Sequence, residues 1–212
     1  MKSELKRLFS ELHKRDGSFC VILMMLLTSI SAWADNVSFI DENGVSQSVD
    51  ATVLAGSEFE ATLGTEDQTT WYVVSNSVTF NNMVTIKGDV RLILGDGKTM
   101  TVNGKSNNEG ILLEGCLTIY RQTYGTGSLT ATSKNCGILS KYSANNLTIY
   151  GGTVTATGDE GVGIGCVDLT INGGTVTANG SGSGIDVSGS VAIRRIGDGS
   201  DDPLSKGNGI TQ

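Results

Sequence analysis

Short alternating phrases of hydrophobic and polar residues recur along most of the chain. Residues 147–157 read LTIYGGTVTAT and residues 169–179 read LTINGGTVTAN, so nine of eleven letters repeat after a step of 22. Weaker copies of both halves occur earlier, and a third short phrase that begins with GI occurs at 110–112, 137–139, 163–165 and 184–186. Each phrase is rich in β-branched residues and alternates every second residue, which predicts a short strand with one buried face.

The three phrases follow one another in a fixed order, at intervals of roughly 22 to 30 residues. Glycine, asparagine and aspartate fill the gaps between them, as expected of sharp corners that need positive φ. Three short strands per repeat, stacked repeat on repeat, predict an all-β fold: a right-handed parallel β-helix of about five turns. Propeller blades would need longer repeats and antiparallel hairpins, and leucine-rich repeats would need their own leucine and asparagine spacing.

Alternation assigns the side chains of each predicted strand to two faces. In LTIY the leucine and isoleucine point inward, and the threonine and tyrosine point outward. The inward positions of successive turns form three ladders: Leu92, Leu117, Leu147, Leu169 and Val191; Met100, Leu129, Val154 and Val176; Ile111, Ile138, Ile164 and Ile185. The predicted core is therefore a stack of aliphatic side chains.

The N-terminal 34 residues differ from the repeats. Five basic residues precede an apolar run at 19–30, and Ala32-Trp33-Ala34 forms an A-x-A cleavage pattern. These features predict a signal peptide over residues 1–34, and hence an exported protein that is secreted or held at the cell surface, with no membrane span in the mature chain. The charged region before the apolar run is long, which leaves an uncleaved signal-anchor open as the alternative.

The rest of the chain divides into a cap and the repeats. Residues 35–75 lack the repeat and are predicted to form an N-terminal β cap over the open end of the solenoid, with Trp71 packing against the first turn. Residues 76–212 carry the repeats. Their last residues contain only the start of another round, which leaves open that the repeats are truncated there.

Charge and composition exclude several classes of function. The signal segment holds five of the 15 basic and three of the 22 acidic residues, so the mature chain has 10 against 19 and a net charge of −9. No nucleic-acid partner is expected of such a chain. The sole histidine, His13, lies in the signal segment. The mature chain therefore has no histidine base, nucleophile pair or metal ligand.

Three cysteines remain in the mature chain: Cys116, Cys136 and Cys166. They lack C-x-x-C spacing and are interpreted as small buried residues, with one disulfide and a free thiol as the alternative.

Several phrases together carry a family resemblance. WYVV at 71–74, VTIKGDVRLILGDGKTMTV at 84–102, LTIYRQTYGTGSLTAT at 117–132 and INGGTVTA at 171–178 resemble one group of exported proteins. They are similar to the β-helical repeat modules of surface proteins from gut Bacteroidales and Firmicutes, which are labelled carbohydrate-binding or adhesin-like. The resemblance covers roughly residues 70 to 190. Those modules often have a GIGGG-type third strand where this chain has GVGIGC, so no ligand contact is carried over.

Candidate binding residues lie on the outward positions of the first strand. One column holds Ile93, Tyr120, Tyr150, Asn172 and Arg194, and the neighbouring column holds Arg91, Thr118, Thr148, Thr170 and Ala192. Tyr120 and Tyr150 would lie on adjacent turns, about 4.8 Å apart. Their rings would stack on sugar faces while amide, hydroxyl and guanidinium groups bond the sugar hydroxyls. The alternative is that the two rings only stabilise each other.

Other surface features suggest further hypotheses. Outward threonines of the second strand (Thr101, Thr130, Thr155 and Thr177) suit ice binding, but they are also the ordinary surface of a threonine-rich solenoid. No cofactor is expected. Calcium is an option at the weak candidates Asp159, Glu160 and Asp186, against the alternative that acidic corners only keep the protein soluble. Asp198, Asp201 and Asp202 form a second acidic group.

We therefore expect a non-catalytic, adhesin-like protein that binds a polysaccharide, another glycan or a host or matrix ligand on its outward strand faces. One alternative is a polysaccharide lyase-like enzyme, in which Arg194 and Arg195 would abstract a proton beside Asp198. The other is a purely structural stalk.

Overall fold

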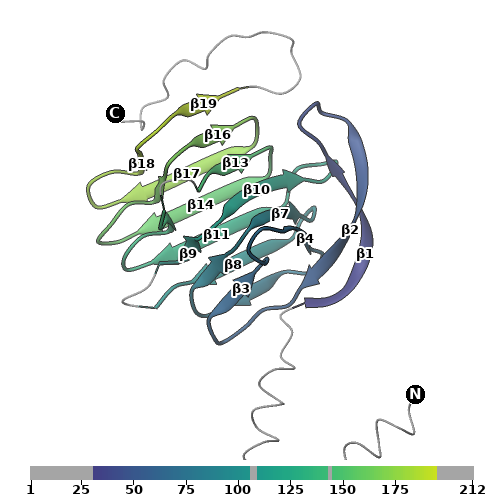
Figure 1. The fold of residues 1–212 in the computed structure, drawn as a ribbon, viewed down its shortest axis with the longest axis horizontal. Helices are drawn as coiled ribbons and strands as arrows, with labels where there is room; N and C mark the ends of the chain where they lie inside the picture. Colours follow the sequence, from purple (N-terminus) through teal and green to yellow (C-terminus); the bar gives the residue numbers. More distant parts are fainter. Residues whose placement is uncertain (1–30, 106–108, 143–144, 195–212) are drawn as a thin grey trace, which may run out of the picture. The chain divides into compact units, whose positions relative to one another are not determined.

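The computed structural model describes residues 31–105, 109–142 and 145–194, and in these ranges the chain consists of strands and corners only. The strands form three sheets, which we call A, B and C. Nearly all neighbouring strands pair in parallel, each with the equivalent strand of the next turn (Figure 1). Sheet C has six strands, so the solenoid makes about six turns. The predicted all-β parallel solenoid with three strands per turn is confirmed, with one turn more than expected.

The strands of each sheet are as follows. Sheet A contains β1 (Ser31–Ile40), β2 (Ser46–Leu54), β4 (Thr69–Val74), β7 (Asp89–Leu94), β10 (Cys116–Arg121), β13 (Leu147–Ile149), β16 (Leu169–Ile171) and β19 (Val191–Ile193). Sheet B contains β5 (Val78–Phe80), β8 (Thr99–Asn103), β11 (Ser128–Ser133), β14 (Thr153–Gly158) and β17 (Thr175–Gly180). Sheet C contains β3 (Ala61–Leu63), β6 (Val84–Ile86), β9 (Ile111–Leu113), β12 (Ile138–Ser140), β15 (Ile164–Cys166) and β18 (Ile185–Val187).

The interior of the solenoid is built from the predicted aliphatic ladders. Met100, Leu129, Val154 and Val176 are register partners in sheet B, and Ile111, Ile138, Ile164 and Ile185 are register partners in sheet C. In sheet A, Leu117, Leu147, Leu169 and Val191 follow one another as predicted. Most of these side chains are fully buried, but Val191 is 44% exposed because β19 is the outermost strand of sheet A among the described residues.

One ladder position was wrong. Leu92 lies opposite Ile119, and the partner of Leu117 on the preceding turn is Val90. Both are inward positions, so the face was right and the register was off by two residues. The outward pairs Arg91–Thr118 and Ile93–Tyr120, which were predicted correctly, already require this register.

Glycine is needed where two corners stack between sheets A and B. Gly152 and Gly174 have φ values of 82° and 84°, a region that side chains rarely adopt. A Cβ on Gly174 would also run into the backbone of Gly151 and Gly152 on the preceding turn. The repeated GG therefore allows both the turn and its close stacking.

The first two strands form an antiparallel hairpin whose register runs from Ser31–Leu54 to Ile40–Ser46. Its turn is fixed by the buried carboxylate of Asp41, which accepts hydrogen bonds from the backbone N–H groups of Asn43 and Val45 and from Nε2 of Gln47. On one side, β2 pairs in parallel with β4. On the other side, the end of β1 pairs with β10 at Ile40–Arg121, so sheet A closes on itself around β2, β4 and β7 (Figure 1).

This arrangement differs from the expected cap in two ways. β3 and β4 fall within residues 35–75, yet they pair with β6 and β7 as ordinary rungs of the solenoid. The hairpin, meanwhile, lies against the outward side of sheet A. The predicted signal segment is largely outside the described residues, and cleavage after Ala34 would fall inside β1 and stays a prediction. Within the described ranges there is no helix long and apolar enough to cross a membrane.

Candidate functional site

A second hydrophobic core lies outside the solenoid, between the hairpin strands β1 and β2 and the solenoid strands of sheet A that begin with β4. It is formed by Phe39, Ala51, Val73, Ile93 and Tyr120, which are all buried. Five partly buried residues pack around them: Val37, Val49, Val53, Trp71 and Tyr150. We call these ten residues the hairpin core. Its members from the solenoid strands are outward-facing side chains, so the hairpin buries a surface that the solenoid alone would expose.

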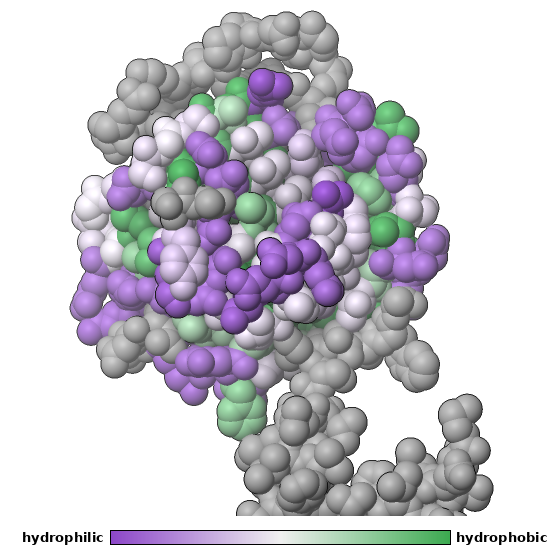
Figure 2. All heavy atoms as spheres, viewed as in Figure 1, coloured by the Kyte–Doolittle hydropathy of each residue, from purple (hydrophilic) through white to green (hydrophobic). Residues whose placement is uncertain are grey.

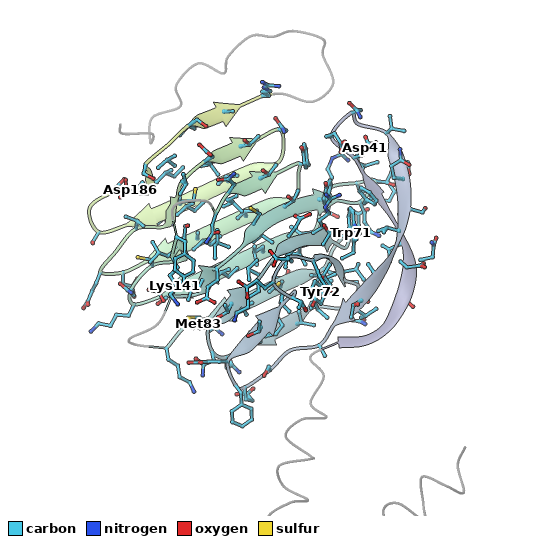
Figure 3. The ribbon with its side chains drawn as sticks, viewed as in Figure 1. Asp41, Trp71, Tyr72, Met83, Lys141 and Asp186 are labelled. Carbon is cyan, nitrogen blue, oxygen red and sulfur yellow. The ribbon has the colours of Figure 1, made fainter. Side chains whose placement is uncertain are left out.

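Aromatic rings occupy the centre of the hairpin core. The ring of Phe39 lies 4.8 Å from Trp71 and 5.0 Å from Tyr120 between centroids, and Trp71 stacks on Tyr120 at 5.2 Å. The guanidinium of Arg91 lies 5.3 Å from the centre of the Trp71 ring. Figure 3 shows Trp71 between the hairpin and the rungs of sheet A. Trp71 thus belongs to a rung of the solenoid and packs under the hairpin, rather than lying in a cap over the end of the solenoid.

The two tyrosines of the predicted platform have different environments. Their rings stack at 5.1 Å on adjacent turns, as the repeat predicts. Tyr120 is only 5% exposed, and this burial raises the pKa of its phenol to about 12. The expectation that Tyr120 offers its ring to solvent was wrong, because the hairpin covers that face. Tyr150 lies at the margin of the hairpin core and is partly exposed.

The remaining platform residues follow Tyr150 along the solenoid. Thr118, Thr148, Thr170 and Ala192 are register partners on sheet A, and all four are partly exposed. The backbone N–H groups of Tyr150, Asn172 and Arg194 each donate to the carbonyl one turn earlier, which keeps these three residues in one column. Arg194 is exposed. The structure therefore brings the predicted residues together, with an open part that begins at Tyr150.

The outward face of sheet B carries the predicted threonine ladder. Thr101, Thr130, Thr155 and Thr177 are register partners, flanked by Asn103, Thr132, Thr157 and Asn179. The array has the regular spacing that the ice-binding hypothesis requires, and ice binding itself stays a hypothesis. The face of the molecule drawn in Figure 2 is mostly hydrophilic or neutral, with hydrophobic residues in small separate patches.

The candidate calcium residues are not assembled into a cluster. Glu160 pairs with Lys134 at 3.0 Å, and Asp159 and Asp186 are exposed. Among the residues that the structure describes, no three histidine, cysteine, aspartate or glutamate side chains form a group suited to a metal ion. Asp198, Asp201, Asp202 and the Arg195 of the lyase hypothesis lie outside the described residues.

Two of the three cysteines are buried, as interpreted from the sequence. Cys136 and Cys166 are 8% and 6% exposed, and burial raises the pKa of the Cys166 thiol to about 11. Cys116 is partly buried. A buried thiol with a raised pKa is a poor nucleophile.

A polar groove of about 430 Å³ lies beside the hairpin, and no pattern in the sequence predicts it. Its lining comes from β1, from the end of β4 and from the loops that follow β7 and β10: Asp35, Asn36, Val37, Ser38, Val73, Ser75, Gly95, Asp96, Lys98 and Gln122. A second groove of about 280 Å³ lies on sheet C beside Tyr142 and Asp186. The first groove depends on β1, whose residues share no repeat with the solenoid. The second is lined by successive rungs of sheet C, among them the register partners Leu139, Gly165 and Asp186.

Comparison with known families bears out the repeat. The chain matches the beta helix repeat family over residues 147–166 and 169–186, the region where the sequence copies are closest. No curated protein and no solved structure matches the chain. The chain is therefore a β-helix repeat protein.

Proposed function

We propose that this is an exported or cell-surface, non-catalytic β-helix protein that binds a polysaccharide or another glycan on its outward faces. One observation carries the proposal. The ring of Tyr150 is stacked on the buried ring of Tyr120, and from there Asn172 and Arg194 continue in the same column beside Thr148 and Thr170.

This arrangement suits a sugar chain for physical reasons. A buried ring behind Tyr150 limits the rotation of its side chain, so less entropy is lost when a ligand binds. Amide, guanidinium and hydroxyl groups then lie on the following turns, spaced as the strands are, and they can donate to and accept from sugar hydroxyls. Tyr120 supports the site as a positioning residue.

A non-catalytic role fits the chemistry of the described residues. The only histidine of the chain is His13, far from this surface in sequence. The open part of sheet A contains Arg194 as its one predicted base, and Arg194 is a guanidinium that stays protonated at ordinary pH. A lyase would need a base able to lose its proton, together with a place for the negative charge that forms.

The test is retention of the purified protein on pectin, xylan, cellulose and mucin glycans, with and without calcium. Retention on one of them without turnover supports the proposal. A requirement for calcium would indicate that acidic corner residues such as Asp159, Glu160 and Asp186 take part in binding. New reducing ends or unsaturated products would instead identify the enzyme. If no glycan retains the protein, the proposal is wrong, and a host surface protein or a structural stalk becomes the better hypothesis.

A further inference from the structure

The connections between sheets A and B differ in length from turn to turn. After β13 and β16 the chain needs only residues 150–152 and 172–174, each ending in Gly-Gly, before the next strand begins. After β10 the connection is residues 122–127, twice as long. In repeat proteins, insertions into single repeats often mark a binding surface. This longer connection, which we call the Tyr124 loop, is the largest departure from the repeat at this corner among the described turns.

The Tyr124 loop is held by several hydrogen bonds rather than left loose. The carboxylate of Asp96 accepts from the backbone N–H groups of Tyr124 at 3.0 Å and Thr126 at 3.1 Å. From the other side, the Arg121 guanidinium donates to the carbonyls of Gln122 at 3.2 Å and Thr123 at 3.0 Å. Because these contacts fix the backbone on both sides of Tyr124, the loop is organised before any ligand arrives.

The same loop connects the solenoid to the hairpin. Oε1 of Gln122 accepts from the backbone N–H of Asp96 at 3.0 Å, and its Nε2 donates to the carbonyl of Ser38 in β1 at 3.2 Å. Gln122, Asp96 and Ser38 all line the polar groove of about 430 Å³. The hydrogen bond from Tyr124 to Asp96 therefore places the Tyr124 loop at the rim of this groove.

Tyr124 is the most exposed large hydrophobic side chain in the described residues, at 82%. A single exposed tyrosine needs no explanation by itself. Here, however, it stands on a fixed, inserted loop beside a groove of matching chemistry. The groove offers the carboxylate of Asp35, the ammonium of Lys98 and the amide of Asn36, while the carboxylate of Asp96 and the amide of Gln122 hold the loop in place.

We propose that the Tyr124 loop and the polar groove form a binding site for an uncharged oligosaccharide segment. The ring of Tyr124 stacks on one sugar, and Asn36, Asp35 and Lys98 bond hydroxyls of the neighbouring sugars. Groups of both charge signs are present, and the acidic ones outnumber Lys98, so neutral sugars fit better than uronic acids. This inference rests on the proposed glycan binding but moves its main contact from the strand face to the corner.

The experiment uses the full chain and compares retention on cellulose, linear xylan and pectin by affinity electrophoresis or pull-down. Variants are Tyr124→Ala and Lys98→Ala for the groove, Tyr150→Ala for the strand face, and Tyr142→Ala as a matched control at another exposed tyrosine (55% exposed). Circular dichroism and melting verify that each variant folds. Since about 1.4 kcal/mol corresponds to a tenfold change and a ring contact is worth about that much, Tyr124→Ala should weaken retention roughly tenfold.

The expected pattern is retention on cellulose or xylan above pectin, weakened by Tyr124→Ala and by Lys98→Ala but not by Tyr142→Ala. If wild-type protein is retained and Tyr124→Ala has no effect, the corner site is wrong while glycan binding stands. Weaker retention of Tyr150→Ala would then place binding on the strand face. Weaker retention of Tyr142→Ala would place it on sheet C. Stronger retention on pectin would overturn the preference for uncharged sugars. If wild-type protein is retained on none of the three but is retained on mucin glycans, the site for plant-type sugars is wrong while glycan binding stands. If mucin glycans do not retain it either, both proposals fail.

Discussion

The outward side of sheet A has two regions built on one repeat. In β4, β7 and β10 the outward column contains Val73, Ile93 and Tyr120, all buried under the hairpin. In the turns of β13, β16 and β19 the same column contains Tyr150, Asn172 and Arg194, which are partly or fully exposed. The inward ladders continue unchanged through both regions. The inward residues of the rungs are therefore aliphatic in both regions, and the outward residues differ according to what packs against them.

The pair of tyrosines shows this most directly. Tyr120 and Tyr150 end the same phrase, LTIY, and occupy equivalent positions on adjacent turns. Tyr120 is buried in the hairpin core, whereas Tyr150 lies at its margin and is partly exposed. The local sequence is the same, so the difference comes from the hairpin, which reaches β10 and not β13.

A charge placed in the hairpin core should have the largest effect. Ala51 is fully buried against sheet A, and Ala51→Asp would leave a carboxylate without a partner or water. We expect a loss of about 3 kcal/mol or more in the free energy of unfolding, measured by urea denaturation. The neighbouring Asp50 points to solvent, so Asp50→Ala is the control and should change stability little. Equal effects of the two changes would contradict the hairpin core.

Truncation of the two tyrosines should separate the covered region from the open one. Tyr120→Ala removes a buried ring with three aromatic neighbours and should cost about 3 kcal/mol or more. Tyr150→Ala removes a ring at the margin and should cost about 1 kcal/mol. Urea denaturation of both variants measures the difference. If Tyr120→Ala is the milder change, the ring is not buried as described.

A smaller effect is expected at the edge of the hairpin core. The Arg91 guanidinium lies over the Trp71 ring, and such a contact at a partly exposed site is worth about 0.5–1 kcal/mol. Arg91→Ala should lower the free energy of unfolding by that amount, and Arg91→Lys should recover part of it. Arg194→Ala in the open region is the control, and it should leave the melting temperature unchanged.

Lowering the pH should destabilise the hairpin turn. Hydrogen bonds hold the pKa of the Asp41 carboxyl below its ordinary value, and the backbone N–H of Val45 is the largest cause. A carboxyl whose pKa is lowered by folding adds stability that is present above its unfolded pKa of about 3.9 and is lost as the pH falls through the folded value. The protection factors of the amides of residues 41–47, which compare their exchange with the intrinsic rate at each pH, should therefore fall below about pH 4, and Asp41→Asn should remove most of that pH dependence. A turn that is equally protected at pH 3 and pH 6 would contradict this role.

The sequence predicted the solenoid well because its information is periodic. Repeated phrases such as LTI at 147–149 and 169–171 imply both strand and register, since each side chain stacks on its copy. Leu92 was misplaced because β7 reads DVRLIL and has three inward aliphatic side chains, Val90, Leu92 and Leu94, that could each continue the ladder. The outward pairs Arg91–Thr118 and Ile93–Tyr120 decide the register.

The hairpin and the groove beside it could not be predicted in the same way. The contacts of β1 and β2 are made with residues that share no repeat with them, so no periodicity points to their partners. One signal was available: Val73, Ile93 and Tyr120 form an apolar outward column that ends at Tyr150, and such a column requires a cover. The alternation of Val49, Ala51 and Val53 in β2 supplies the matching face.

The contact between Gln122 and Ser38 joins residues 84 positions apart, and this separation matters for the order of folding. During synthesis the hairpin emerges before β10 exists, so its apolar face can at first meet only β4 and β7, and its contact with β10 waits until nearly a third of the chain has followed. Contacts that close long stretches of chain form slowly, whereas each rung needs only the turn before it. We therefore expect the solenoid to assemble first and the hairpin to dock in a separate, later kinetic phase. β1, which is synthesised before the other described strands, would thus be the last of them to form all of its contacts.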